Sequence, residues 1–107
     1  PPRCDDCGGL IRPSVVLFGE ELPADKLARL WQEMETGFDL IFTVGTSSLF
    51  EYIIEPVRLG QTTGVPTVEI NPEITTVSSI VDYKIRGSAG AVLDLIWESY
   101  LAWWPWR

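Results

Sequence analysis

The stretch Phe38-Asp39-Leu40-Ile41-Phe42-Thr43-Val44-Gly45-Thr46-Ser47-Ser48 decides the fold class of this 107-residue chain. Residues 38–44 are mostly β-branched, aromatic or otherwise apolar, lack polar alternation, and end at Gly45. Such a run is typical of a central parallel strand that is covered on both faces. We therefore expect a buried strand here, followed by a loop over residues 45–48.

The rest of the chain alternates between helix and strand patterns. Predicted helices cover residues 23–36, 50–63 and 91 onward, and predicted strands cover residues 15–18, 66–70 and 83–85. Gly37 and Gly64 follow the first two helices, where glycine commonly ends a helix. Strands that alternate with helices predict an α/β fold with a parallel sheet and right-handed crossovers.

Length and composition favour a single domain over residues 1–107. With 46% hydrophobic residues the chain can bury one core. We divide it into a cysteine-containing segment (1–13), an α/β part (14–101) and a tail (102–107) in which Trp103, Trp104 and Trp106 lie close together. Tryptophans at a chain end expose a large apolar area unless they dock on their own protein or on another chain.

Charge and apolar patterning exclude two classes of partner. The chain has 15 acidic and 8 basic residues and no Lys/Arg cluster, so nucleic-acid binding is not expected. No apolar run approaches the roughly 20 residues that cross a bilayer, so no membrane partner is expected. The chain begins with Pro1 and lacks a secretory signal pattern, which suggests a piece of a longer, cytoplasmic protein.

Two cysteines, Cys4 and Cys7, are the candidate metal ligands. They are too close in sequence for a disulfide between them to hold a fold together. The Gly8-Gly9 pair beside them allows the tight turn of a metal-binding knuckle. A redox-active dithiol is the alternative. The chain contains no histidine, so it lacks the commonest general base at neutral pH.

Three short polar segments follow the three predicted strands of the sheet. They are Gly45-Thr46-Ser47, Asn71-Pro72-Glu73 and Gly87-Ser88-Ala89. The carboxyl ends of parallel strands share one edge, where loops and helix N-termini bind nucleotides. Taken singly, the first segment also fits a helix cap and the second a plain turn. Together they predict a nucleotide site.

The order of these segments resembles the C-terminal half of the sirtuin family, which are NAD-dependent protein deacylases. The most specific elements are Cys4-Asp5-Asp6-Cys7-Gly8-Gly9-Leu10-Ile11-Arg12-Pro13 and Val15-Val16-Leu17-Phe18-Gly19-Glu20, upstream of the three strand-end segments. The likeness covers residues 4 to about 98. It implies half of a three-layer Rossmann-like (DHS-like) parallel sheet, joined to half of a small zinc-ribbon module.

The resemblance assigns residues to a cofactor site for NAD. It places residues 45–47 against the ribose and phosphates, Asn71 and Glu73 around the adenosine ribose, and the Ala89 backbone near the adenine. These six positions are Gly45, Thr46, Ser47, Asn71, Glu73 and Ala89. It also makes Cys4 and Cys7 one pair of a four-cysteine zinc site, which is incomplete in this chain.

The resemblance further assigns residues 16–20 to acyl-lysine peptide binding. The Val16 carbonyl would accept a hydrogen bond from the acyl-lysine amide, and Leu17 and Phe18 would wall the acyl-lysine tunnel, followed by Gly19 and Glu20. The peptide would add as an extended strand held by main-chain hydrogen bonds. Without the resemblance, residues 15–18 would be interpreted as a core strand.

Departures from the family pattern limit the functional prediction. The family usually has Val-Tyr-Pro-Ala where this chain has Phe50-Glu51-Tyr52-Ile53, and often tryptophan at Leu17. Its Gly-Ala-Gly-x-Ser loop, its Gln-Asn-x-Asp segment and its general-base histidine have no counterpart in these 107 residues. In the family, the acyl oxygen attacks the nicotinamide ribose, nicotinamide leaves, and the histidine activates a ribose hydroxyl, which completes acyl transfer to ADP-ribose.

We therefore expect part of a protein-lysine deacetylase or deacylase with little or no catalysis by itself. Its partners would be an acyl-lysine protein or peptide and a missing N-terminal half, or a second copy bound through the Trp-rich tail. The alternative is a non-catalytic nucleotide-binding or interaction module that pairs with a second chain.

Overall fold

The computed structural model describes residues 1–104, which divide into two compact units. The first unit is Pro1–Glu33, and the second holds the described residues from Met34 onward. Helix α1 (Ala24–Thr36) begins in the first unit and ends in the second. The domain boundaries expected after residues 13 and 101 stay predictions.

The first unit holds little regular structure before α1. Its one paired segment before that helix is an isolated antiparallel bridge between Arg3 and Leu10. The prediction of a buried strand over residues 15–18 is wrong: the segment forms no strand, and its four residues are 44–94% exposed. Within residues 1–33 no second strand pairs with it, and its backbone makes local turns instead.

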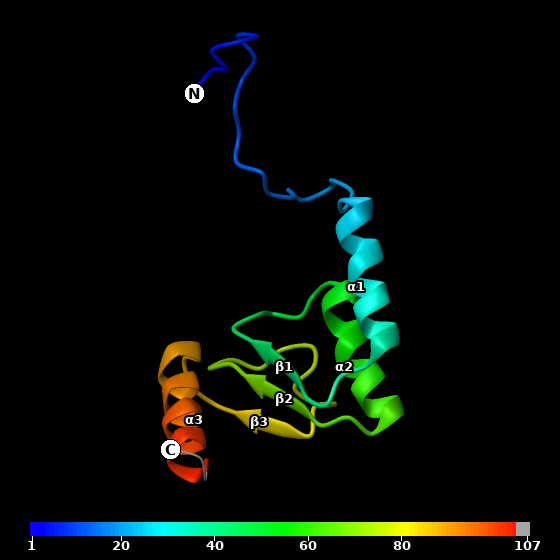
Figure 1. The fold of residues 1–107 in the computed structure, drawn as a ribbon, viewed down its shortest axis with the longest axis vertical. Coiled ribbons are helices and arrows are strands. Elements are labelled where there is room, and N and C mark those ends of the chain that lie inside the picture. Colours follow the sequence, from blue (N-terminus) through cyan, green and yellow to red (C-terminus); the bar gives the residue numbers. More distant parts are fainter. Residues whose placement is uncertain (105–107) are drawn as a thin grey trace. The chain divides into compact units, whose positions relative to one another are not determined.

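The second unit is built on a three-stranded parallel sheet. Its strands are β1 (Ile41–Val44), β2 (Thr67–Ile70) and β3 (Tyr83–Ile85), in the spatial order β1-β2-β3 (Figure 1). Val44 pairs with Ile70 on one side of β2, and Ile70 pairs with Ile85 on the other. The predicted α/β architecture with a parallel sheet is confirmed.

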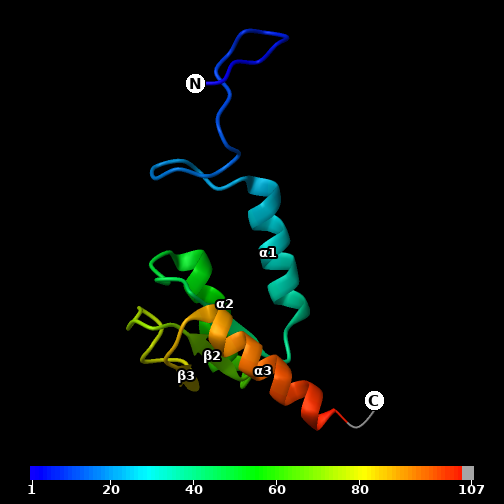
Figure 2. The ribbon, with the colours of Figure 1, turned by 90° about the vertical axis from the view of Figure 1, so that its left-hand side faces the viewer.

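Helices cover both faces of this sheet, as Figures 1 and 2 show for α2 (Glu51–Thr63) and α3 (Ala89–Trp103). Ile54 and Val57 of α2 pack with Val77, and Val92 of α3 packs with Val68 and Ile70 of β2. Successive side chains of a strand point to opposite faces, so Val68 and Ile70 share the face that α3 covers, and the buried Thr67 and Glu69 lie on the other face. The result is a three-layer, Rossmann-like arrangement.

The central position in the sheet belongs to β2 and not to β1. All four residues of β2 are buried, whereas Phe42 of β1 is 43% exposed and β1 is an edge strand of this sheet. The expectation that β1 is central and covered on both faces is therefore wrong. An apolar run predicts a buried strand but does not reveal which of several such runs has neighbours on both sides.

The last helix is longer than the apolar pattern predicted. It begins at Ala89, ends at Trp103, and its C-cap residue is Trp104. Trp103 therefore belongs to α3, and residues 105–107 of the predicted tail lie outside the described part of the chain. None of the helices within residues 1–104 has the length and apolar character needed to span a membrane.

Candidate functional site

Backbone hydrogen bonds hold the three strand-end loops next to one another. The Gly45 N–H donates to the Ile70 carbonyl over 3.0 Å, and the Asn71 N–H donates to the Ile85 carbonyl over 3.2 Å. Each bond continues the parallel ladder one residue beyond the strands. The segments that begin at Gly45, Asn71 and Arg86 therefore leave the sheet side by side at its carboxyl edge.

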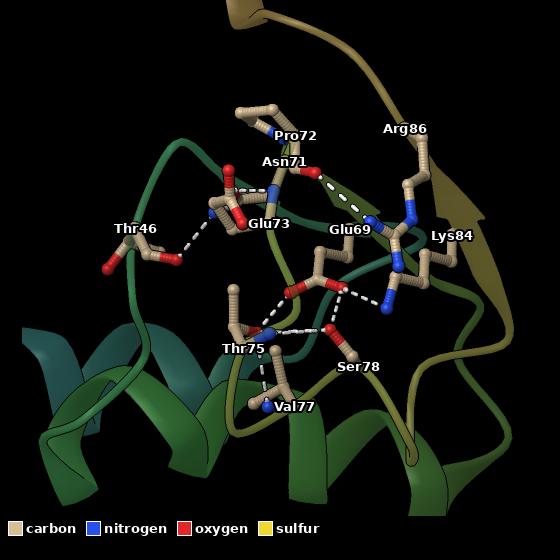
Figure 3. A network of polar contacts seen from close by, with 10 residues as sticks. All are labelled: Thr46, Glu69, Asn71, Pro72, Glu73, Thr75, Val77, Ser78, Lys84 and Arg86. Atoms are coloured by element: carbon tan, nitrogen blue, oxygen red, sulfur yellow. Dashed lines mark hydrogen bonds and ion pairs between the residues drawn. The ribbon is translucent and has the colours of Figure 1, made fainter.

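Asn71 joins two of these loops through its side chain (Figure 3). Its Nδ2 donates to the Thr46 carbonyl over 2.9 Å, and its Oδ1 accepts from the Glu73 N–H over 3.0 Å. The residue is only 7% exposed. The structure thus brings Thr46, Asn71 and Glu73 together, three of the six residues that the sequence assigned to the cofactor.

A buried carboxylate supports the loop that carries Asn71 and Glu73. Glu69 of β2 is 1% exposed and accepts hydrogen bonds from the hydroxyls of Thr75 and Ser78, the latter over 2.5 Å. Lys84 Nζ of β3 lies 3.9 Å from Glu69 Oε2 (Figure 3). These contacts fix the start of the turn at residues 75–78 against β2, which orders the segment that follows the strand.

The loop after β1 has a constrained backbone and an unpaired buried hydroxyl. Gly45 and Ser48 have φ angles of 63° and 53°, in the left-handed region that costs a non-glycine residue energy. Ser48 is fully buried, and its Oγ has no hydrogen-bond partner among the described residues. A Cβ at Gly45 would meet nothing within 4 Å, so this loop has open space beside it at Gly45.

Both helices that follow the strand-end loops present their N-termini at this edge. Phe50 is the N-cap of α2 and Ser88 the N-cap of α3, and neither makes a side-chain cap hydrogen bond. First-turn N–H groups and the helix dipole then remain able to attract an anion. Ala89, a predicted adenine contact, is the first residue of α3.

An arginine side chain connects the segment after β3 with the segment after β2. Arg86 Nη1 donates to the Pro72 carbonyl over 3.2 Å (Figure 3). Gly87 follows, and a Cβ at that position would lie 2.7 Å from Val92 Cγ2, so the chain can turn into α3 only with a very small residue there. The predicted Gly87-Ser88-Ala89 segment therefore has a packing role at its first position.

The cysteine segment of the first unit forms a closed turn. The Cys4 N–H donates to the Gly9 carbonyl and the Gly8 N–H donates to the Cys4 carbonyl, both over 2.9 Å. The pKa of the Cys4 thiol is lowered by the backbone N–H of Cys7, and then by that of Asp6 and by the Cys7 side chain. Both cysteines are free, and residues 1–104 contain no group of three or more candidate metal ligands.

The segment assigned to peptide binding lies beside a cavity of about 390 Å³ in the first unit. Arg12, Val15, Val16 and Glu20 are among its lining residues. Phe18 is 94% exposed, and the Val16 N–H and carbonyl have no hydrogen-bond partner among the described residues. An exposed residue with an unpaired main-chain N–H and carbonyl, as at Val16, can pair with an added peptide strand.

Sequence reasoning missed two residues that shape these sites. Glu69 is a carboxylate in the middle of the apolar run Val68-Glu69-Ile70, a signal that a buried charge needs partners nearby. Arg12 forms an ion pair with Glu20, and only the eight-residue separation links them in the sequence. Neither pairing could be read from periodicity.

Comparison with known proteins gives the same class of fold from both sequence and structure. The family model described as Sir2 family matches residues 1–51. "NAD-dependent protein deacylase 2" of Pseudomonas aeruginosa is 47% identical over 89 residues, which are 83% of this chain and 35% of that protein. "NAD-dependent protein deacylase 1" of Archaeoglobus fulgidus is 43% identical over 93 residues, covering 87% of this chain and 38% of that protein.

Solved structures show the same likeness. The crystal structure of a Sir2 homologue–NAD complex matches 94% of this chain and 39% of its own with a TM-score of 0.82 and 40% identity. A Sir2–p53 peptide–NAD+ structure matches with a TM-score of 0.77 and 28% identity, covering 94% of this chain and 42% of its own.

These matches define a Rossmann-like α/β chain related to NAD-dependent deacylases. The chain belongs to the Sir2, or sirtuin, family. It spans 35% and 38% of the length of the two curated relatives described above.

Proposed function

We propose that this chain supplies part of the NAD site and part of the acyl-lysine peptide site of an NAD-dependent protein-lysine deacylase. The observation that carries the proposal is the hydrogen bond from Asn71 to the Thr46 carbonyl, which joins two strand-end loops at one edge of a parallel sheet. Relatives named NAD-dependent protein deacylases and a Sir2 homologue structure with NAD support it.

The residues at the sheet edge fit the chemistry of a dinucleotide. Backbone N–H groups of residues 45–47 and the start of α2 would hold phosphates, and the Glu73 carboxylate would accept hydrogen bonds from ribose hydroxyls. When bound, NAD supplies a ribose carbon that takes up the acyl oxygen as nicotinamide leaves.

For the peptide, we propose strand addition along residues 15–18, with the Val16 main chain as the anchor. The exposed Leu17 and Phe18 side chains would contact the aliphatic part of the acyl-lysine. Because the main chain carries the recognition, peptides of different sequence would bind through the same contacts.

For the cysteine turn, we propose half of a zinc-ribbon module. Cys4 and Cys7 would supply two thiolate ligands, and the N–H groups that lower the pKa of Cys4 favour the thiolate form that binds metal. A closed structural zinc site has four ligands, so two more would have to come from other residues.

Binding without turnover is the expected behaviour of the 107 residues alone. They contain no histidine to accept a proton from a ribose hydroxyl. Calorimetry with NAD, run beside an assay of nicotinamide release from NAD and an acetyl-lysine peptide, tests this directly. NAD binding with no nicotinamide release supports the proposal. Absence of NAD binding contradicts it, and turnover would show that another group replaces the histidine.

A second candidate function, an interaction module that pairs with another chain, is favoured by one observation. Trp97 stacks on Tyr100 at 5.7 Å between ring centroids, Tyr100 contacts Trp104 at 5.1 Å, and all three are at least 42% exposed. Light scattering separates the two: a dimer lost on Trp97→Ala, with no NAD binding, would favour the module.

A further inference from the structure

The Glu20 carboxylate makes three contacts that close a short loop in the first unit. It accepts from Arg12 Nη1 over 2.7 Å and from Arg12 Nη2 over 2.9 Å, one bond to each carboxylate oxygen. The Leu17 N–H donates to the second of these oxygens over 3.0 Å. A planar guanidinium in this bidentate geometry fixes the orientation of the carboxylate as well as its position.

The remaining main-chain bonds of the loop engage Leu17 but not its neighbour Val16. The Glu20 N–H donates to the Leu17 carbonyl over 3.0 Å, and the Val15 N–H donates to the Pro13 carbonyl over 2.9 Å. Leu17 therefore has both its N–H and its carbonyl engaged. Val16 has neither engaged by any residue within 1–104.

This difference distinguishes two neighbouring residues of the segment. The Val15–Pro13 and Glu20–Leu17 bonds are local turns on either side of Val16. The Glu20 contacts occupy both main-chain groups of Leu17 and leave those of Val16 open. A peptide strand that pairs at this point can therefore bond to Val16 and not to Leu17.

We propose that Glu20, oriented by Arg12, is a positioning residue that sets the register of the bound acyl-lysine peptide. This inference rests on the proposed peptide site. By holding the Leu17 N–H, the carboxylate prevents that residue from pairing with the peptide and leaves the neighbouring Val16 as the anchor. Glu20 itself need not touch the peptide.

In a simpler role, which we call a loop staple, the ion pair between Arg12 and Glu20 would only hold the two ends of the loop together. The side chains of Arg12 and Glu20 are 57% and 39% exposed, and exposed ion pairs contribute little to folding stability. The two roles differ in what matters at position 20. A staple needs only opposite charges at 12 and 20, whereas the positioning role needs an acceptor for the Leu17 N–H.

A charge-swapped chain, Arg12→Glu with Glu20→Arg, separates these roles because it keeps the ion pair and removes the acceptor. We would measure amide hydrogen exchange at Leu17 in the free 107-residue chain, and binding of a fluorescent acetyl-lysine peptide by anisotropy. The swap should speed Leu17 exchange and weaken peptide binding by about tenfold each, as for loss of one hydrogen bond to a charged group. Asp25→Asn, an exposed charge change outside this loop, is the matched control and should change neither.

Three outcomes would overturn the inference, and they are distinguishable. Wild-type exchange and peptide binding in the swapped chain would reduce the pair to a staple. Fast Leu17 exchange in the wild-type chain would show that the contact is absent. A protected Leu17 in a wild-type chain that binds no acetyl-lysine peptide would refute the proposed peptide site, and the positioning role with it.

Discussion

Asn71 Nδ2 donates a hydrogen bond of 2.9 Å to the carbonyl oxygen of Thr46, 25 residues earlier in the chain. One buried amide side chain thereby connects the loop after β1 with the loop after β2. The Asn71 backbone N–H adds a bond to the Ile85 carbonyl, at the end of β3. Asn71 is thus bonded to residues at the ends of both neighbouring strands, and it is a structural residue of the site as well as a predicted cofactor contact.

This double role predicts different consequences for Asn71 and Glu73. Asn71→Ala should lower the free energy of unfolding by about 1–3 kcal/mol, because the buried Asn71 amide no longer bonds to the Thr46 carbonyl and the Glu73 N–H. Glu73 is exposed, so Glu73→Ala should change stability by no more than about 0.5 kcal/mol. Both should weaken NAD binding. Urea denaturation and calorimetry check the pair; equal stability losses would contradict the assignment.

Close packing of α2 on β2 predicts that Gly60 cannot be enlarged. A Cβ at Gly60 would lie 2.5 Å from Thr67 Cγ2 and 2.9 Å from the Val65 carbonyl oxygen. Gly60→Ala should destabilise the fold by about 1–3 kcal/mol through overpacking. Gly90 in α3 is the matched control: its Cβ would meet nothing within 4 Å, so Gly90→Ala should leave stability unchanged or raise it by up to about 1 kcal/mol. Thermal denaturation of both variants gives the comparison, and similar melting temperatures would contradict it.

The Arg12 contact predicts an unusual titration for Glu20. Hydrogen bonds from Arg12, and then from the Leu17 N–H, lower the pKa of Glu20 to about 2 from its usual 4.5. Because the folded-state pKa is the lower one, the contribution of this contact is fully present above pH 4.5 and is lost as the pH falls towards 2. Carbon NMR of the Glu20 carboxyl should show this low midpoint, and Arg12→Ala should move it upward. A normal midpoint in the wild-type chain would refute the contact.

The cysteine turn predicts zinc binding that depends on both thiols. Two thiolates per chain can complete a four-ligand site only when two chains share one zinc, so a metal content of about one zinc per two chains is expected at saturation. Cys4→Ser and Cys7→Ser should each abolish it, whereas Asp5→Asn in the same turn should retain it. Elemental analysis with a colorimetric chelator measures all four proteins. Unchanged zinc in either cysteine variant would contradict the proposal.

Much of the fold followed from local patterns. The positions of α1, α2, β2 and β3 were predicted within one or two residues, because helical spacing, glycine stops and apolar runs each have a local physical cause. Residues 15–18 show the limit of that approach. Their composition suits a strand, but a strand forms only if another strand pairs with it. The local sequence does not reveal whether that partner strand is present.

The sequence predicted where in the fold the site lies, but not which residues contact one another there. Three polar segments after three parallel strands must share an edge, and the structure places them there. The register between the strands determines which groups meet at this edge. It decides that the Asn71 side chain bonds to Thr46 and that Glu69 is buried beneath the same loop. Register is a property of the folded sheet, and neither residue carries a local sign of it.

Mapping the NAD-induced shifts in an amide-resolved NMR spectrum of the 107-residue chain tests the central claim most directly. We predict that the amides of Gly45, Thr46, Ser47, Asn71, Glu73 and Ala89 shift together and saturate with one dissociation constant. Shifts confined to other parts of the chain, or no shifts at millimolar NAD, would contradict a cofactor site at the carboxyl edge of this sheet.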